Sequence, residues 1–350
     1  MNIRNSRKLA TAFALAAAAA GVSQAQTAPA AGQDKVQKLD SFVVTGSNIP
    51  TAADAVAASV LARPDSAVLA VFGAGNQAEF ECAALARILA ETLANGGLED
   101  AEHRASFVKE IEEAMLSRRI DAAVHSMKDM PTAQPDGLAI TAFLPREDAR
   151  DVLIAGDIHR IADLRKGAIV GTSALRRRAQ LLHRRPDLQI VTLRGNVDTR
   201  LAKREAGVVE ATLLALAGLK RLGLGHVGTP VPEDEMLPAV GQGAVCIECR
   251  SDDTSTRTLL AAINHAPTEI AVRAEHAMLA VLDGSCRTPI AGHAVFAADG
   301  ALHLRGLIAK PDGSQAIMTE RRGPAADAAK MGSDAGLELK ARGGPGFLSA

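Results

Sequence analysis

The chain has 350 residues, with 39 Lys and Arg against 40 Asp and Glu, and a formal net charge of -1. A hydrophobic share of 47% at this length suffices for two or three packed domains and excludes a disordered or fibrous protein. The balanced charge and the lack of Trp and Tyr argue against a nucleic-acid binder that works through global charge or aromatic stacking.

The first 25 residues are typical of a secretory signal peptide. Basic residues open the segment, an apolar run follows at 9–22, and Ser23 and Ala25 supply a small-x-small cleavage pattern. The run is too short for a stable membrane anchor, and no later segment of the sequence is longer and as apolar. The segment 1–25 therefore predicts export; the alternative is an Ala-rich helix buried in the fold.

Residues 26–64 are rich in Ala, Thr, Ser and Pro without a sustained period, which predicts a linker. A strand is then expected at 67–72, a glycine turn at 73–78 (Gly-Ala-Gly-Asn-Gln-Ala) and a helix at 83–93. This order is that of a dinucleotide-binding fingerprint, which also needs a second strand that ends in an acid. The sequence enters another helix instead. A nicotinamide site and a plain strand-turn-helix both remain open, and the plain turn is favoured.

A helix is predicted around 107–115, with Glu112 largely off its apolar face. The strand expected at 121–127 leads into Lys128 and Asp129, and a proline follows. An acid beside a lysine at the carboxyl end of a strand is where open sheets place ligand-binding groups. The alternative is a surface ion pair at a turn.

Residues 160–204 form a basic block of twelve Lys and Arg against three Asp. Within it, the pattern predicts a strand at 168–171 and a helix at 174–183. Arg176 and Arg177 fall in the first turn of that helix, where the helix dipole disfavours cations. We therefore predict that they share an anionic ligand with the free N–H groups of that turn.

The same arrangement recurs in the next unit of the chain. Ser173 and the threonine before it are expected at the cap of the first helix, and a second strand at 189–193 ends before Arg194 and Arg200. A solvated charge run is the alternative, but it has no reason to recur at equivalent positions. Residues 144–295 contain no aromatic side chain, which favours a small molecule with several carboxylates over a nucleic acid.

The last third of the sequence predicts a small α+β domain. Its parts are an amphipathic helix at 267–282, three strands joined by Asp-Gly turns at 299–300 and 312–313, and a closing helix at about 325–340.

Four cysteines are too few and too scattered for a disulfide scaffold. Cys286 lies beside Arg287 on a glycine-bearing loop, which is compatible with a reactive thiolate or with an inert thiol. Cys246 and Cys249 form a single C-x-x-C inside an expected strand, which favours buried thiols over a metal or redox site.

Six motifs follow one another between residues 107 and 347. They are 125–131 (His-Ser-Met-Lys-Asp-Met-Pro), 144–148 (Leu-Pro-Arg-Glu-Asp), 171–177 (Gly-Thr-Ser-Ala-Leu-Arg-Arg), 193–201 (Leu-Arg-Gly-Asn-Val-Asp-Thr-Arg-Leu), 237–244 (Leu-Pro-Ala-Val-Gly-Gln-Gly-Ala) and 283–289 (Asp-Gly-Ser-Cys-Arg-Thr-Pro). In residue type, order and spacing they resemble the signatures of the porphobilinogen deaminase family, the hydroxymethylbilane synthases.

The resemblance implies an α/β protein with two domains similar to periplasmic binding proteins and a small C-terminal α+β domain. It implies domains at 65–150, 151–236 and 251–350, with 237–250 returning to a shortened first domain. The family joins four porphobilinogen molecules head to tail, releases ammonia at each step and hydrolyses off the linear tetrapyrrole hydroxymethylbilane. The expected pathway is tetrapyrrole (haem) biosynthesis.

The same match assigns residues. Asp129 would be the catalytic carboxylate, which stabilises positive charge on pyrrole nitrogens and assists proton transfer. Dipyrromethane would be attached covalently at Cys286, and the other cofactor contacts would be Lys128, Ser173, Arg176 and Arg177. The substrate contacts would be Arg194, Arg200, Arg221 and Gln242. The resemblance implies a monomer that binds the small molecule porphobilinogen, and no metal, nucleic acid or membrane.

The front of the chain departs from the family pattern. The slot of the family's Arg-Gly-Ser turn, at 73–76, holds Gly-Ala-Gly-Asn. The family resemblance predicts a cytoplasmic enzyme, whereas the segment 1–25 predicts a periplasmic location. An alternative is therefore a non-catalytic two-lobed binding protein for a small polycarboxylate; the presence of Asp129 and Cys286 favours the enzyme.

Overall fold

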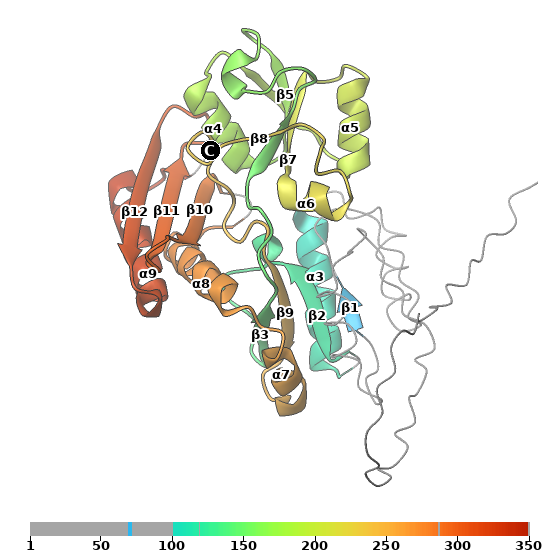
Figure 1. The fold of residues 1–350 in the computed structure, drawn as a ribbon, viewed down its shortest axis with the longest axis vertical. Coiled ribbons are helices and arrows are strands. Elements are labelled where there is room, and N and C mark those ends of the chain that lie inside the picture. Colours follow the sequence, from blue (N-terminus) through green and yellow to red (C-terminus); the bar gives the residue numbers. More distant parts are fainter. Residues whose placement is uncertain (1–68, 72–100, 119, 286–287, 349–350) are drawn as a thin grey trace, which may run out of the picture. The chain divides into compact units, whose positions relative to one another are not determined.

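The computed structural model describes residues 69–71, 101–118, 120–285 and 288–348 (Figure 1). The predictions for the segment 1–25, the linker, the glycine turn at 73–78, the helix at 83–93 and Cys286 lie outside these residues. The described part forms two sheets with helices and a third, antiparallel sheet with its own helices. This agrees with the predicted class, α/β with a smaller C-terminal α+β domain. None of the helices within these ranges is long and apolar enough to cross a membrane.

The first sheet has four strands, in the order β1, β2, β9, β3. Their bounds are β1 (Leu69–Val71), β2 (Ala122–Ser126), β9 (Val245–Arg250) and β3 (Leu138–Phe143). β1 is parallel to β2, and β9 is antiparallel to both β2 and β3. β9 therefore lies between β2 and β3, although both of these strands come much earlier in the chain. Its residues after Val245 are all buried, as a strand inside a covered sheet requires.

Helix α3 (Ala101–Leu116) precedes β2, the 3-10 turn Met127–Asp129 follows β2, and helix α7 (Thr254–Ala261) follows β9. Ile111 and Met115 of α3 are buried as predicted. The expectation that Glu112 lies off the buried face is wrong, because its side chain is also buried. The physical reason is that α3 contacts β2, β3 and β9 together, so its buried face is wider than the apolar stripe.

The second sheet has five strands, in the order β6, β5, β7, β4, β8. Their bounds are β6 (Gln189–Val191), β5 (Ile169–Gly171), β7 (Ala211–Ala215), β4 (Asp151–Ile154) and β8 (Thr229–Pro230). β5 is parallel to β6 and β7, whereas β4 is antiparallel to β7 and β8. β5 and β6 are therefore neighbours, as the repeated pattern predicts; these are the two strands that precede the arginines of the basic block.

The helices of this sheet are α4 (Leu175–Arg184), α5 (Val197–Glu205) and α6 (Leu216–Arg221), with a 3-10 turn at Ile161–Asp163. The expected cap of α4 needs correction: the N-cap is Ala174, which makes no side-chain cap hydrogen bond. Thr172 Oγ1 instead accepts from the backbone N–H of Ala174 at 3.2 Å. This N–H belongs to the N-cap residue itself, so the hydrogen bond does not satisfy a free N–H of the first helical turn. In α5 the N-cap is Asn196, whose side-chain Oδ1 accepts from Thr199 N at 2.6 Å.

The C-terminal domain is an antiparallel sheet covered by two helices. Its elements are α8 (Ala266–Val281), β10 (Ile290–Phe296), β11 (Leu302–Ala309), β12 (Ala316–Gly323), a 3-10 turn (Ala325–Asp327) and α9 (Ala328–Gly343). Gly300 and Gly313 have φ values of +81° and +75°, which explains the two Asp-Gly hairpin turns. Helices α8 and α9 pack on each other and on the sheet (Figure 1). Gly332 permits this packing because a Cβ there would strike the carbonyl oxygen of Ala274.

Candidate functional site

A buried carboxylate holds the two arginines that the sequence assigns to an anionic ligand. Asp151, the first residue of β4, has no exposed surface. Its Oδ2 lies 2.7 Å from Nη1 of Arg176, and its Oδ1 lies 2.8 Å from Nη2 of Arg177. Both arginines stand in the first turn of α4 and are themselves buried. The charge of Asp151 therefore offsets the unfavourable position of two cations at a helix N-terminus.

Backbone carbonyls fix the same two guanidinium groups from another side. Arg176 Nη1 donates to the carbonyl oxygen of Leu237 at 2.8 Å, and Arg177 Nη1 donates to that of Leu213 at 2.9 Å. Burial by itself would raise the pKa of Asp151, but the charges and hydrogen bonds of the two arginines outweigh burial and hold that pKa below its ordinary range. Asp151 is therefore ionised at neutral pH.

Gln242 belongs to the same cluster. Its Nε2 donates to Oδ1 of Asp151 at 2.9 Å and to the carbonyl oxygen of Ala149 at 2.6 Å. The turn that carries Gln242 needs Gly243, which has a φ of +85° and whose Cβ would strike the carbonyl oxygen of Glu147. Gln242 is thus held by its neighbours as rigidly as the two arginines.

Lys128 and Asp129 lie in the 3-10 turn that follows β2, and both are partly buried. Burial lowers the pKa of Lys128 from its ordinary value, while the carboxylate of Asp129 acts in the opposite direction. The charges of Arg177, Asp151 and Arg176 also act on this pKa. The structure therefore brings the first-sheet pair within electrostatic range of the Asp151 cluster.

The remaining predicted side chains make different contacts. Ser173 is exposed between β5 and α4, and Arg194 is exposed after β6. Arg200, in α5, donates through Nε to the carbonyl oxygen of Gly195 at 2.8 Å. Arg221, at the end of α6, donates through Nη2 to the carbonyl oxygen of Gly243 at 3.0 Å. Of these four, Arg221 contacts the turn that holds Gln242.

The charges of this cluster suit a ligand that carries carboxylates. Three cationic side chains, Lys128, Arg176 and Arg177, influence one another together with two carboxylates, Asp129 and Asp151. The balance favours positive charge, and guanidinium groups match carboxylates in planar, paired hydrogen bonds. The acetate and propionate groups of a dipyrromethane fit such a donor set.

The loop expected to carry that cofactor is described at its two ends. Thr288 Oγ1 accepts from Ser285 N at 2.9 Å, and this hydroxyl donates to Ser285 O at 2.7 Å. Lys340 of α9 donates to a carboxylate oxygen of Asp283 at 2.9 Å. Both flanks of residue 286 are therefore anchored, while Cys286 lies outside the described residues.

Cys246 and Cys249 are buried in β9. Burial raises the pKa of both thiols, and Sγ of Cys249 lies 3.1 Å from Oγ1 of Thr141. Within the described ranges, no group of three or more His, Cys, Asp or Glu side chains is arranged to hold a metal ion. Both thiols therefore lie buried in a strand inside the covered sheet.

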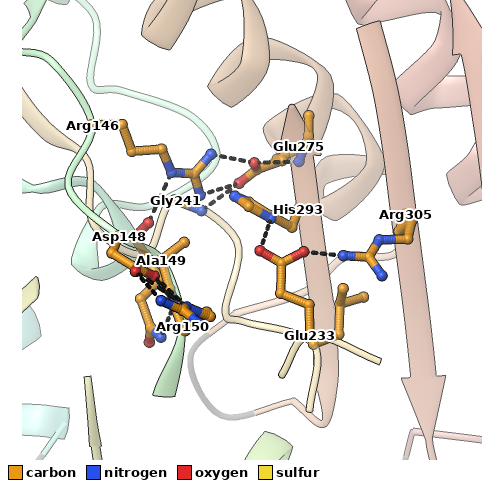
Figure 2. A network of polar contacts seen from close by, with 12 residues as sticks. Arg146, Asp148, Ala149, Arg150, Glu233, Gly241, Glu275, His293 and Arg305 are labelled. Atoms are coloured by element: carbon orange, nitrogen blue, oxygen red, sulfur yellow. Dashed lines mark hydrogen bonds and ion pairs between the residues drawn. The ribbon is translucent and has the colours of Figure 1, made fainter. Parts of the chain in front are cut away.

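A second buried carboxylate, Glu275 of α8, was not singled out by the sequence. It accepts from Nη1 and Nη2 of Arg146 at 2.5 and 3.1 Å, from Gly241 N at 2.7 Å and from Ala294 N at 2.8 Å (Figure 2). Close to it, Glu233 lies 2.9 Å from Nδ1 of His293 and also pairs with Arg305. Glu275 thus joins the segment after β3, the turn before β9 and strand β10.

Asp151 was also missed, although the sequence carries a signal for it. An acid opens the otherwise apolar strand Asp151–Ile154, and a charge at the edge of a covered strand needs a buried partner. Glu275 has a weaker signal. The same helix, Ala266–Val281, also carries Glu269, which is partly exposed, and Arg273, which is exposed, so a charge in this helix does not by itself indicate a buried one.

The fold and this cluster define an α/β protein with a buried cluster of arginines around a carboxylate. Comparison with protein families matches residues 84–258 to the dipyrromethane cofactor-binding domain of porphobilinogen deaminase, and residues 269–341 to its C-terminal domain. The chain belongs to the porphobilinogen deaminase family, transferases of tetrapyrrole (haem) biosynthesis that use a dipyrromethane cofactor. The match begins at residue 84, earlier than the motifs between 107 and 347 predict.

Individual relatives agree with this assignment. A porphobilinogen deaminase of Paracoccus denitrificans is 55% identical over 252 residues, which cover 72% of this chain and 80% of the relative. A chloroplastic porphobilinogen deaminase of rice is 50% identical over 256 residues, 72% of each chain. Among solved structures, a periplasmic sulfonate-binding protein from Methylobacillus flagellatus has 16% identity and a TM-score of 0.32, with 59% of this chain and 65% of that chain covered.

Proposed function

We propose that this chain is an active hydroxymethylbilane synthase. It condenses four porphobilinogen molecules head to tail, releases one ammonia for each, and hydrolyses off the linear tetrapyrrole. Family membership supports the reaction, and the observation that carries it to this chain is the electrostatic cluster of Lys128, Asp129, Asp151, Arg176 and Arg177.

In this proposal, Asp129 accepts and returns protons at the pyrrole nitrogens through its carboxylate oxygens and stabilises positive charge that develops on them. The turn places this carboxylate in a partly buried position, where a charged group acts more strongly on developing charge than it would in water.

The other side chains bind and orient. Lys128, Ser173, Arg176 and Arg177 hold the carboxylates of a dipyrromethane attached at Cys286, which supplies two linked pyrroles to the site when bound. Arg194, Arg200, Arg221 and Gln242 bind the acetate and propionate groups of porphobilinogen. Arg194 is exposed after β6, and guanidinium groups match carboxylates in planar, paired hydrogen bonds.

Intact mass of the full chain, purified from a host that makes porphobilinogen, tests this proposal. We expect an excess mass of two linked pyrrole units that disappears in Cys286→Ser, and turnover of porphobilinogen by the unmodified sequence. A bare polypeptide mass with no turnover would contradict the enzyme assignment.

A bare polypeptide mass without turnover would favour a binding protein for a small polycarboxylate. The sequence feature behind this candidate is the turn 73–76, which has neither Arg nor Ser where the family has both. A titration with porphobilinogen separates the two functions, since the binding protein would hold the compound without releasing ammonia.

We also infer that porphobilinogen is the substrate, that the chain is a monomer and that it works in the cytoplasm. Light scattering after size-exclusion chromatography tests the monomer. The same mass spectrum tests the location, because removal of residues 1–25 would indicate export through the predicted signal.

A further inference from the structure

Asp151 is shared by three side chains to which the proposed function gives ligand-binding roles. Arg176 lies on its Oδ2, whereas Arg177 and Gln242 both donate to its Oδ1. The shared carboxylate has no exposed surface, so it does not itself meet a ligand from solvent. Among the described residues, its side chain contacts Arg176, Arg177 and Gln242.

The arrangement fixes each guanidinium group in two directions. Arg177 donates through Nε and Nη2 to Asp151 and through Nη1 to Leu213 O, so the plane of the group is determined. Arg176 is held between Asp151 and Leu237 O. An arginine side chain has many rotamers, and one that is ordered before the ligand arrives does not lose that rotamer entropy on binding.

We propose that Asp151 is a positioning residue, which presets Arg176, Arg177 and Gln242 to receive the carboxylates of a pyrrole ligand. The identity of the ligand rests on the proposed function, whereas the presetting of the side chains rests on the contacts alone. Asp151 touches no reacting atom; it acts through the three side chains that it orients.

The protonation state supports this role. Burial acts to raise the pKa of Asp151, and the two arginines overcome that effect and keep the pKa below the ordinary range. The carboxylate is therefore ionised at neutral pH, where a carboxylate ligand is ionised as well.

A substitution at Asp151 has opposite expected effects under presetting and under simple electrostatics. Asp151→Asn removes a negative charge next to an anion site, so charge alone predicts tighter binding of a carboxylate ligand. Presetting predicts weaker binding, because the amide cannot hold two guanidinium groups through charge-assisted hydrogen bonds. The sign of the change in affinity is thus the measurement.

The control is Asp148→Asn. Asp148 also bears a carboxylate that is paired with an arginine, Arg150, through bonds of 2.7 to 3.1 Å, and it lies three positions earlier in the chain. It is partly buried and has no contact with Arg176 or Arg177 among those the structure describes. The two variants remove the same charge from the same stretch of sequence.

The probe is the pyrrole diacid that lacks the aminomethyl group of porphobilinogen, so that no ammonia can leave and no condensation occurs. It is titrated into chains that also carry Cys286→Ser, so that the side chains assigned to the dipyrromethane carboxylates are open to it. Calorimetric titration of the full chain measures its dissociation constant, and circular dichroism confirms folding. We expect Asp151→Asn to weaken binding at least tenfold and Asp148→Asn to change it less than twofold. Unchanged or tighter binding by folded Asp151→Asn overturns the proposal, and so does a lack of binding by the chain that carries Cys286→Ser alone.

If Asp151→Asn does not fold, the unsubstituted chain decides. Proton exchange at the Nε–H groups of Arg176 and Arg177, followed by NMR, is expected to be much slower than at the exposed Arg178 of the same helix. Equally fast exchange overturns the proposal. This readout needs neither turnover nor cofactor, so failure of the proposed enzyme activity and failure of presetting are told apart.

Discussion

Glu275→Gln removes the charge of a carboxylate that accepts four hydrogen bonds from three residues. Glu275 is fully buried, and the side chain of Arg146 is 11% exposed, so the substitution leaves a largely buried guanidinium charge without its carboxylate partner. Breaking a buried pair by removal of one partner costs about 3–5 kcal/mol. Because Glu275 also holds Gly241 N and Ala294 N, the loss is expected toward the upper end of that range.

Urea unfolding followed by circular dichroism measures the effect, with Glu113→Gln as the matched control. Glu113 pairs with Lys109 at 4.0 Å on α3, and both side chains are more than half exposed, so its loss should cost at most about 0.5 kcal/mol. If the free energy of unfolding falls no more in Glu275→Gln than in Glu113→Gln, the reasoning is refuted. Such a result would mean that Arg146 loses no stabilisation when its buried partner is removed.

The pH dependence of the same carboxylate has a definite sign. Burial acts to raise the pKa of Glu275, but Arg146 and the backbone donors hold that pKa below its ordinary value. A depressed pKa contributes stability above the unfolded value of about 4.3 and loses it as pH falls further. Glu275→Gln lacks this carboxylate, so its acid unfolding should begin at a higher pH than that of the unsubstituted chain.

Asp129→Asn should abolish porphobilinogen consumption while leaving the thermal midpoint and any attached cofactor unchanged; turnover at the normal rate would remove Asp129 from the mechanism. Arg194→Ala should weaken binding of the pyrrole diacid by about 1.5–3 kcal/mol, the value of a charged hydrogen bond, and an unaltered dissociation constant would show that this exposed arginine does not meet the ligand. Burial, followed by the charge of Glu248, raises the pKa of Glu112 to about 7, so the free energy of unfolding should fall as pH rises from about 4.3 to 7. Urea titrations of Glu112→Gln should lack this pH dependence. If the dependence persists in the variant, another group is responsible for it. Gly243→Ala should lower the thermal midpoint, since a Cβ there strikes Glu147 O at a φ of +85°; an unchanged midpoint would show that the turn relaxes freely.

Local chemistry explains what could be predicted from the sequence. The Asp-Gly turns at 299–300 and 312–313 require positive φ at glycine, so the three-stranded sheet followed from neighbouring residues alone. The arginines after β5 and β6 were expected at one edge of a sheet, because both follow a strand and precede a helix in the same way.

The sequence by itself determined the family, the fold class and the residue types at the site, since each is written in motifs of a few adjacent residues. Only the tertiary structure decided how those residues are held. Strand β4 lies antiparallel beside β7, and this places Asp151 against arginines that follow it by 25 and 26 positions in the chain. A charge at a helix N-terminus indicates that a counter-charge is needed, but which carboxylate supplies it depends on which strands pair. Strand pairing is set by burial of the whole sheet.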